Sequence, residues 1–297
     1  AWCFNWNSKG RKPISFFQQN EGNPTDLNTN YGRTLYRTQQ AGADQAIRAI
    51  LWYQGESDNG AADVHENGFV ALYQDWLASY PNVERVYVHQ LREGCGVTAF
   101  DVELRDRQRR LADQFGPISA LSTTGISTHD GCHYPFVGGY EVLGDQNAAI
   151  LRRDLYNGPA SPNLDAPNPA YVWLSTPDRK TITITLREPA ADLVFDDGTE
   201  AFFRVDGSAA VVTNGFVSGG AIVLELDGPA DDGTSLTYAG HAGAGPWVTN
   251  VTGVGMFTFI EPLYPSLGPI PVPSNLVATA FSGCIVDLTW DSDPLVN

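Results

Sequence analysis

The stretch Ile50-Leu51-Trp52-Tyr53-Gln54-Gly55-Glu56-Ser57 joins an apolar run to an abrupt series of polar residues. A short apolar run bounded by a turn signal is typical of a buried strand in a parallel sheet. Polar groups directly after such a strand lie at its carboxyl end, where open α/β sheets bind their ligands. The side-chain amide of Gln54 is therefore a candidate hydrogen-bond donor to a developing oxyanion.

Apolar runs and amphipathic segments alternate on both sides of this stretch, up to about residue 157. We expect strands over Ala46–Trp52, Val86–Leu91 and Ile118–Leu121, and helices over Asn67–Tyr80, Val102–Phe115 and Val137–Tyr156. Apolar residues at helical spacing mark the helices, and prolines mark two of their ends. This alternation predicts a parallel, doubly wound α/β sheet of the flavodoxin-like type.

A second polar cluster, Thr128-His129-Asp130-Gly131-Cys132-His133-Tyr134, follows the third expected strand. A carboxylate beside an imidazole fixes its tautomer and stabilises the imidazolium, which a general base behind a hydroxyl nucleophile requires. Asp130 and His133 are therefore a candidate orienting acid and general base, at the same sheet edge as Gln54 and Arg92. The alternative is a structural histidine, because a single Asp-x-x-His pattern recurs by chance.

The pattern changes after a linker rich in Pro, Asn and Gly at 157–169. Short, alternating, β-branched segments follow, separated by turn signals such as Asn214-Gly215, and we expect strands over Thr181–Leu186, Ala201–Val205, Ala210–Val212, Ala221–Leu226 and Ser235–Tyr238. This punctuation predicts a C-terminal β-sandwich domain over residues 165–262. Beyond a second Pro-rich linker, residues 274–297 resemble the truncated start of a fibronectin type III module.

Composition limits the possible partners. With 34 acidic and 18 basic residues, the net charge of −16 disfavours binding to nucleic acid or anionic membranes, and no apolar run is long enough to span a bilayer.

The four cysteines, Cys3, Cys95, Cys132 and Cys284, lack zinc-site spacing. Because Cys95 and Cys132 follow two parallel strands, we expect a disulfide between them, as in an extracellular protein; the alternative is two free buried thiols.

Together, these features resemble the SGNH hydrolase superfamily, specifically its sialate O-acetylesterase and acetyl xylan esterase group. The resemblance runs over most of Pro13–Tyr156 and rests on Asn30-Tyr31-Gly32-Arg33, Ala49–Asp58 and Asp130-Gly131-Cys132-His133-Tyr134. Several separated motifs in the right order are far harder to match by chance than one.

The resemblance implies a role for each matching residue. His133 would be the general base, Asp130 its orienting partner and Gln54 the oxyanion donor, with no metal or organic cofactor. Glu56 would brace its loop or contact substrate rather than transfer a proton. Arg92 is not part of the resemblance, but its place at the same sheet edge makes it a candidate to bind a sugar carboxylate, with a structural ion pair as the alternative.

The family's nucleophilic serine sits on an N-terminal Gly-x-Ser block, and no such block is recognisable in this chain. We therefore expect residues 1–157 to form an esterase-like domain that lacks its N-terminal part, within a longer multidomain chain. Ser57 is an internal alternative, because Gly55-Glu56-Ser57-Asp58-Asn59 resembles a nucleophile elbow, but Asn59 stands where that motif requires a small glycine.

The sequence thus predicts a secreted or cell-surface carbohydrate esterase that hydrolyses O-acetyl esters of sugars by a Ser-His-Asp mechanism. The expected partner is an acetylated glycan, with neither nucleic-acid binding nor membrane insertion. One alternative is a non-catalytic glycan-binding or adhesive module that reuses the esterase fold. A glycosidase using Glu56 and Asp130 is a weaker alternative, because nothing in the sequence places the two carboxylates at the separation that this chemistry requires.

Overall fold

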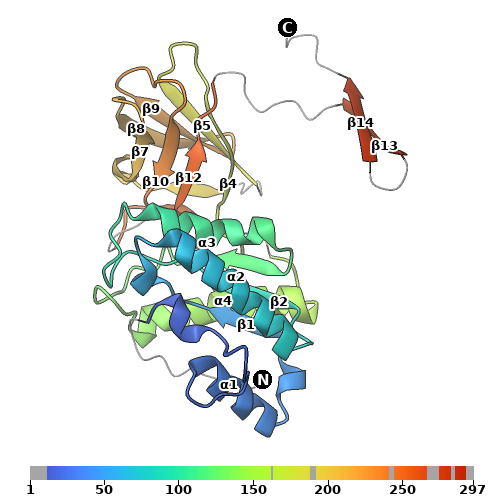
Figure 1. Ribbon diagram of the computed structural model, residues 1–297. Helices are drawn as coiled ribbons and strands as arrows, with labels where there is room; N and C mark the ends of the chain where they lie inside the picture. The colour runs from blue at the N-terminus through green and yellow to red at the C-terminus, as the bar shows by residue number, and fades with distance from the viewer. Residues whose placement is uncertain are drawn as a thin grey trace.

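The computed structural model describes residues 12–161, 163–187, 192–240 and 244–265, together with the backbone of 274–281 and 285–291. An α/β region up to Tyr156 lies directly against a β-rich region that begins at Pro169 (Figure 1). The expected disulfide falls within the described residues, whereas Cys3 and Cys284 lie outside them.

A parallel three-stranded sheet forms the centre of the α/β region. Its strands are β1 (Ala49–Trp52), β2 (Arg85–His89) and β3 (Ile118–Leu121), in the spatial order β1-β2-β3. Both pairings are parallel, so the carboxyl ends of all three strands meet at one edge. The predicted parallel α/β sheet is confirmed at this level.

Helices cover both faces of this sheet. Neighbouring side chains of a strand point in opposite directions, so each strand packs against helices on both sides. Val86 and Val88 pack into a core with apolar side chains of α2 (Ala62–Ser79). Tyr87, between them, packs instead with Ile150 of α4 (Glu141–Tyr156). This two-sided burial is the arrangement expected of a doubly wound sheet.

Two further helices complete the α/β region: α1 (Asn30–Gln40), which the sequence analysis does not predict, and α3 (Val102–Gln114). The Thr29 hydroxyl caps α1 by accepting a hydrogen bond from the Gly32 backbone N–H at 2.9 Å. Short 3-10 turns lie at η1 (Ile14–Phe17), η2 (Asp44–Ala46) and η3 (Glu56–Asp58).

Two helices begin at residues other than those predicted. Helix α2 begins at Ala62, five residues before the expected Asn67. Helix α4 begins at Glu141 rather than Val137, because the irregular turn η4 (Phe136–Tyr140) precedes it and Gly138 there has a left-handed φ of 72°.

The β-rich region consists of antiparallel strands around one apolar core. A four-stranded sheet has the order β4-β5-β9-β8, a three-stranded sheet the order β12-β10-β7, and β11 pairs with β6. The strands are β4 (Pro169–Leu174), β5 (Thr181–Leu186), β6 (Leu193–Phe195), β7 (Phe203–Asp206), β8 (Val212–Ser218), β9 (Ala221–Leu226), β10 (Ser235–Tyr238), β11 (Val248–Asn250) and β12 (Phe259–Pro262), with a 3-10 turn η5 (Thr199–Phe202). Side chains from both larger sheets share this core. The predicted β-rich region is confirmed, while the sandwich arrangement itself stays a prediction.

The last described strands, β13 (Ser274–Phe281) and β14 (Ile285–Asp291), form an antiparallel hairpin. Two strands are expected there, but their assignment to a fibronectin type III module stays a prediction.

Helix α3 lies along the boundary between the α/β and β-rich regions (Figure 1). Arg105 and Arg109 on this helix are both almost fully buried and point their guanidinium groups into the β-rich region. The Arg105 guanidinium donates to the backbone oxygen of Ala239 at 2.8 Å, and Arg109 pairs with Glu261 at 2.6 Å. The boundary is therefore a polar, hydrogen-bonded interface.

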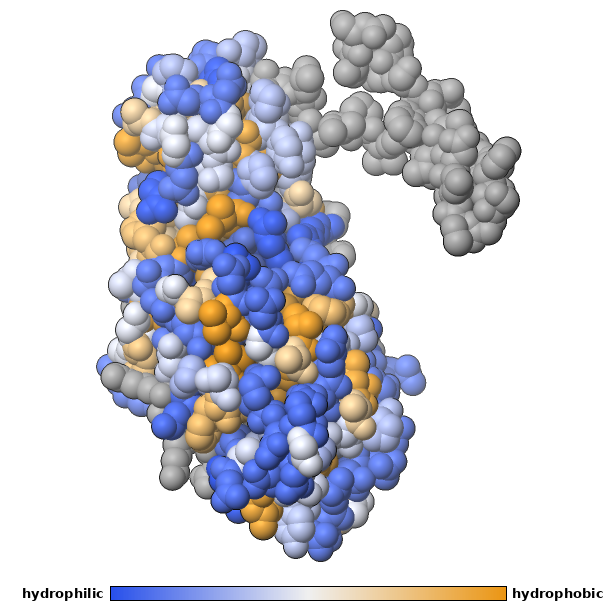
Figure 2. Space-filling model, in the orientation of Figure 1, coloured by the Kyte–Doolittle hydropathy of each residue, from blue (hydrophilic) through white to orange (hydrophobic). Residues whose placement is uncertain are grey.

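The exposed face in Figure 2 is mostly hydrophilic, with separate hydrophobic patches. Among the residues that the structure describes, no helix is both long and apolar enough to cross a membrane.

Candidate active site at the carboxyl edge of the parallel sheet

The loop after β3 brings Asp130 and His133 together. The Nδ1 atom of His133 lies 3.5 Å from Oδ2 of Asp130, and both side chains are exposed, at 70% and 65%. Because Nδ1 faces the carboxylate, Nε2 is the ring nitrogen left to exchange a proton with another group. The separation is longer than a good hydrogen bond, as is common for catalytic pairs without substrate.

The other carboxylate oxygen of Asp130 closes the loop. Its Oδ1 accepts hydrogen bonds from the backbone N–H groups of His133 at 2.6 Å and Cys132 at 2.8 Å. These bonds lower the pKa of Asp130 below its usual value. Gly131 permits the tight turn with its φ of 97°. The carboxylate is therefore charged at neutral pH and oriented by its own loop.

A disulfide between Cys95 and Cys132 joins this loop to the one that follows β2, with a Cα–Cα distance of 4.6 Å. The prediction of this bridge is confirmed. The Cys95 N–H also donates to the Gly131 carbonyl oxygen at 2.9 Å. A Cβ on Gly94 would lie 2.4 Å from that same oxygen, so the two loops touch backbone to backbone.

Gln54 lies directly after β1, as expected, but its side chain is buried and already engaged. Its Nε2 donates to the Lys12 carbonyl oxygen at 2.9 Å and to Oδ2 of Asp58 at 2.8 Å. Both amide hydrogens therefore bind acceptors inside the protein. To donate to an oxyanion, Gln54 would have to exchange one of these bonds, so its predicted role stays a prediction.

A second Asp–His pair, which the sequence analysis does not anticipate, lies beside Gln54. The Nδ1 atom of His65 lies 3.2 Å from Oδ2 of Asp58, and the side chains are only 1% and 4% exposed. The Asp58 carboxylate also accepts the backbone N–H of Ile14 at 2.9 Å. This pair is closed to a glycan, and Asp58 joins the start of η1 to η3, the turn that follows β1.

The hydrogen bonds to Asp58 determine its charge state. Burial raises the pKa of its carboxyl group, but the hydrogen bonds from His65, Gln54 and Ile14 outweigh this effect, so the pKa lies below its usual value. Asp58 thus braces the loop after β1, which is the role expected of Glu56. Of the described residues, none forms a hydrogen bond with the Glu56 carboxylate, and substrate contact by Glu56 stays a prediction.

Arg92 follows β2 and is buried, at 6% exposure. Its guanidinium carbon lies 5.5 Å from the centroid of the Tyr134 ring. The Nε and Nη1 atoms have no hydrogen-bond partner among the described residues, and burial lowers the pKa of the group. Arg92 is therefore a buried cation next to the Asp130–His133 loop, and two of its guanidinium nitrogens have no hydrogen-bond partner among the described residues.

His129 has a local role in the same loop. Its Nδ1 atom is 2.8 Å from the backbone nitrogen of Gly131, and its ring packs edge-on against Tyr134. Ser57 is exposed on η3, and among the described residues no serine hydroxyl forms a hydrogen bond with His133. No group of three or more His, Cys, Asp or Glu side chains within the described part of the chain could hold a metal ion.

The geometry at this edge places a carboxylate–imidazole pair, an amide and a buried guanidinium on loops that follow three parallel strands. Residues 7–142 match a carbohydrate esterase family. Its description reads "Carbohydrate esterase, sialic acid-specific acetylesterase", and the matched stretch contains all three strands, Gln54, Arg92 and Asp130–His133. No curated protein matches the chain. The match supports a general esterase function and does not favour the non-catalytic alternative.

Proposed function

We propose that this protein is a carbohydrate esterase that hydrolyses O-acetyl esters of sugars by a Ser-His-Asp mechanism. The observation that carries the proposal is the Asp130–His133 pair on an exposed loop at the carboxyl edge of a parallel sheet. In this mechanism, Nε2 of His133 removes the proton of a serine hydroxyl as that oxygen attacks the acetyl carbonyl. Nε2 then returns the proton to the departing sugar oxygen, and water hydrolyses the acetyl-serine.

Asp130 has the properties that the mechanism requires of the orienting acid. Its backbone hydrogen bonds keep it ionised, and an ionised carboxylate beside Nδ1 stabilises the imidazolium that forms in the transition state. The attacking hydroxyl is the group that the described residues do not supply. We place it on a serine elsewhere in the full-length protein, outside residues 12–161 of the α/β region.

Arg92 favours an acidic sugar over a neutral one. The Nε and Nη1 atoms of Arg92 are buried without a partner among the described residues, and they would gain one from a substrate carboxylate once the loops around them open to admit the sugar. Such charge-assisted bonds are about twice as strong as neutral ones. Sialic acids carry a carboxylate, whereas xylose does not. We therefore propose O-acetylated sialic acid as the preferred substrate class.

Secretion to an oxidising compartment is part of the proposal. The Cys95–Cys132 disulfide and a glycan substrate are both compatible with an extracellular location. We also propose that residues 1–157 form the esterase domain and residues 165–262 an accessory domain, with a fibronectin type III-like module from residue 274.

The test is an acetate-release assay on the full-length protein, with O-acetylated sialic acid and acetylated xylose as alternative substrates. We expect hydrolysis of both with a higher kcat/KM for the acidic sugar. Arg92→Met should raise KM for the acidic sugar by about tenfold, the loss of one charged hydrogen bond, and leave KM for the neutral sugar within twofold.

His129→Gln is the matched control, because it changes the same loop without touching the proposed substrate group. Equal losses for both sugars in Arg92→Met would remove the carboxylate assignment. The absence of acetate release from either sugar by the folded full-length protein would contradict the esterase itself.

A further inference from the structure

We infer that the β-rich region is a structural part of the candidate site, because it positions the loop that carries Asp130 and His133. The contact runs through Gln90 and through the turn Asn250–Gly255, which precedes β12. These groups act as positioning residues and touch no substrate. Only the kinetic arm of the test below rests on the proposed function.

The first contact is between two backbones. The Gly255 N–H donates to the Thr124 carbonyl oxygen at 2.9 Å. A Cβ on Gly125, whose φ is 98°, would lie 2.3 Å from the Gly253 carbonyl oxygen. A Cβ on Gly255 would lie 2.5 Å from three atoms of Thr124. Only glycine permits this approach, so the segment that leads from β3 to Asp130 rests directly on the turn of the β-rich region.

The second contact is the side-chain amide of Gln90, which follows β2. Its Oε1 accepts the Thr258 N–H at 2.8 Å, and its Nε2 donates to the Thr258 carbonyl oxygen at 2.8 Å. The amide therefore pairs with Thr258 as a neighbouring strand would. The Gln90 backbone carbonyl accepts the Thr123 hydroxyl at 2.9 Å, so the same residue holds both the β-rich region and the segment after β3.

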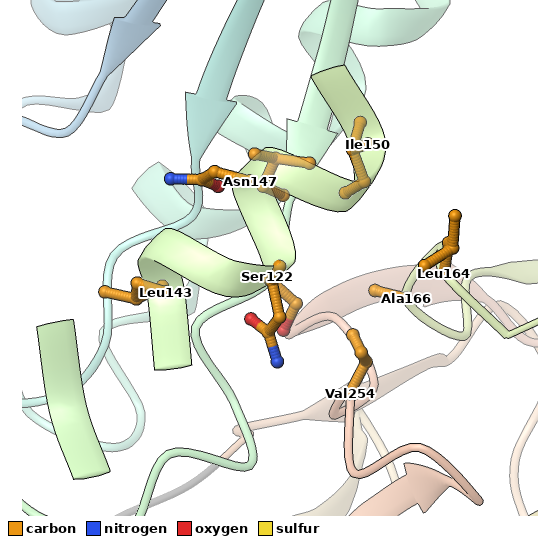
Figure 3. A pocket seen from close by; sticks show the side chains of 9 residues that line it. Ser122, Leu143, Asn147, Ile150, Leu164, Ala166 and Val254 are labelled. Carbon is orange, nitrogen blue, oxygen red and sulfur yellow. The ribbon is translucent and has the colours of Figure 1, made fainter. Parts of the chain in front are cut away.

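All members of this network are buried: Gln90, Thr123, Thr124 and Thr258 are each at most 5% exposed. Buried polar groups that lose their partners are costly, so movement of the β-rich region would be opposed at each of these bonds. A small pocket at the same junction is lined by Ser122, which follows β3, by Val254 of the turn and by Leu143 and Asn147 of α4 (Figure 3).

An interface that only held the two regions together would not need contacts with the segments that follow β2 and β3. The ion pair between Arg187 and Asp113 also joins the two regions, but it lies between the end of β5 and the end of α3, on half-exposed side chains. It holds the regions together without touching any loop at the carboxyl edge. Arg187→Gln is therefore the matched control for a contact that spans the interface but has no positioning role.

The test measures amide hydrogen exchange by mass spectrometry on the full chain, which requires no catalysis. Gly255→Ala, whose Cβ would push Thr124 away from the turn, and Gln90→Leu, which removes both bonds to Thr258, should each raise exchange in residues 122–133 by about tenfold or more. Helix α2 and strand β1 should keep their wild-type rates. Arg187→Gln should leave residues 122–133 unchanged. Wild-type protection of 122–133 in both variants would overturn the inference. A uniform rise throughout the chain in both would also overturn it, because the contacts would then serve overall stability alone.

The kinetic arm uses the full-length protein and acetate release. Both variants should lower kcat by about tenfold or more with KM within twofold, because a displaced base costs rate rather than binding. Arg187→Gln should keep both constants within twofold. If wild-type protein releases no acetate, the proposed function fails while the exchange result still decides the positioning inference. Unchanged kcat in an active protein with loosened residues 122–133 would show that the contact positions nothing catalytic.

Discussion

Two segments that follow strands of the parallel sheet each contain an Asp–His pair, and the two pairs differ in almost every other respect. After β1, Asp58 in η3 and His65 in α2 are buried, and Asp58 accepts a hydrogen bond from the first residue of η1. After β3, Asp130 and His133 are exposed, and the imidazole has only the carboxylate beside it. The buried pair has the shorter separation, 3.2 Å against 3.5 Å, yet it has no access for a substrate.

The comparison shows that a carboxylate beside an imidazole does not identify a general base. What distinguishes the two pairs is whether the second ring nitrogen can reach a reacting group. For His65 this nitrogen is buried without a partner among the described residues, whereas the His133 ring is open to solvent. Access therefore gives the buried pair a structural role and leaves the exposed pair as the candidate for proton transfer.

The largest expected effect separates the two histidines by function. In the full-length protein, His133→Ala should lower kcat for acetate release by about a thousandfold or more, judged by other hydrolases that have lost a triad member. Its free energy of unfolding should change little, because the side chain is exposed. His65→Ala should instead lower the free energy of unfolding, measured in urea. A thousandfold loss for His65→Ala with normal stability would reverse the assignment of the two pairs.

The second prediction concerns how each loop is held. The loop after β3 is fixed covalently, by a disulfide between cysteines 37 residues apart, whereas the loop after β1 is held by hydrogen bonds. The double variant Cys95→Ala/Cys132→Ala should lower the free energy of unfolding by about 4 kcal/mol, the chain-entropy value for such a loop. Denaturant unfolding of the oxidised wild type and the variant measures this difference. A dithiol should destabilise the wild type and leave the variant unchanged. Equal stabilities would show that the hydrogen bonds of the loop suffice.

The third prediction tests whether Gln54 takes part in catalysis or only stabilises the fold. As an oxyanion donor, its loss in Gln54→Ala should lower kcat about a hundredfold with KM nearly unchanged. If Gln54 instead stabilises the fold, Gln54→Ala should lower the free energy of unfolding and leave kcat of the folded molecules near the wild-type value. The reason is that the Gln54 amide donates hydrogen bonds to Lys12 and Asp58. Steady-state kinetics together with urea unfolding on the same preparation distinguish the two roles.

Much of the α/β region is predictable because its signals are local. The bounds expected for β3 are those observed, and α3 begins at the expected Val102 and ends one residue earlier. The Asp130–His133 pair and the disulfide follow from sequence neighbours and from the rule that parallel strands end at one edge. Patterns of short range therefore sufficed for the parallel strands, for the proximity of Asp130 and His133 and for the disulfide.

The remainder depends on contacts between distant residues. Periodicity cannot show that Arg105 and Arg109, in a helix that reads as a charged surface helix, are buried against the β-rich region, because their partners are more than 130 residues away. For the same reason, the bond between Asp58 and the Ile14 N–H has no signal in the motif around Gln54. Residue types can be read from the sequence, but tertiary packing determines that the Asp58 carboxylate is buried and stabilises the fold, whereas Asp130 stays exposed.

The smallest expected effect is the pH dependence of the buried pair. The pKa of Asp58 is lowered in the folded protein, despite the opposing effect of burial, so on acidification the unfolded chain takes up this proton first. The stability that Asp58 contributes is therefore fully present above its ordinary pKa of 3.8 and is lost as the pH falls through the lower folded value. Asp58→Asn should lower the free energy of unfolding by about 2 kcal/mol at pH 7, the value of charged hydrogen bonds, and by progressively less below pH 4. Urea unfolding of both proteins at pH 7, 4 and 3 measures this convergence. Asp145→Asn is the control, because that carboxylate is exposed on α4. If the free energies of unfolding of wild type and Asp58→Asn differ by the same amount down to pH 3, the charge of Asp58 does not contribute to stability.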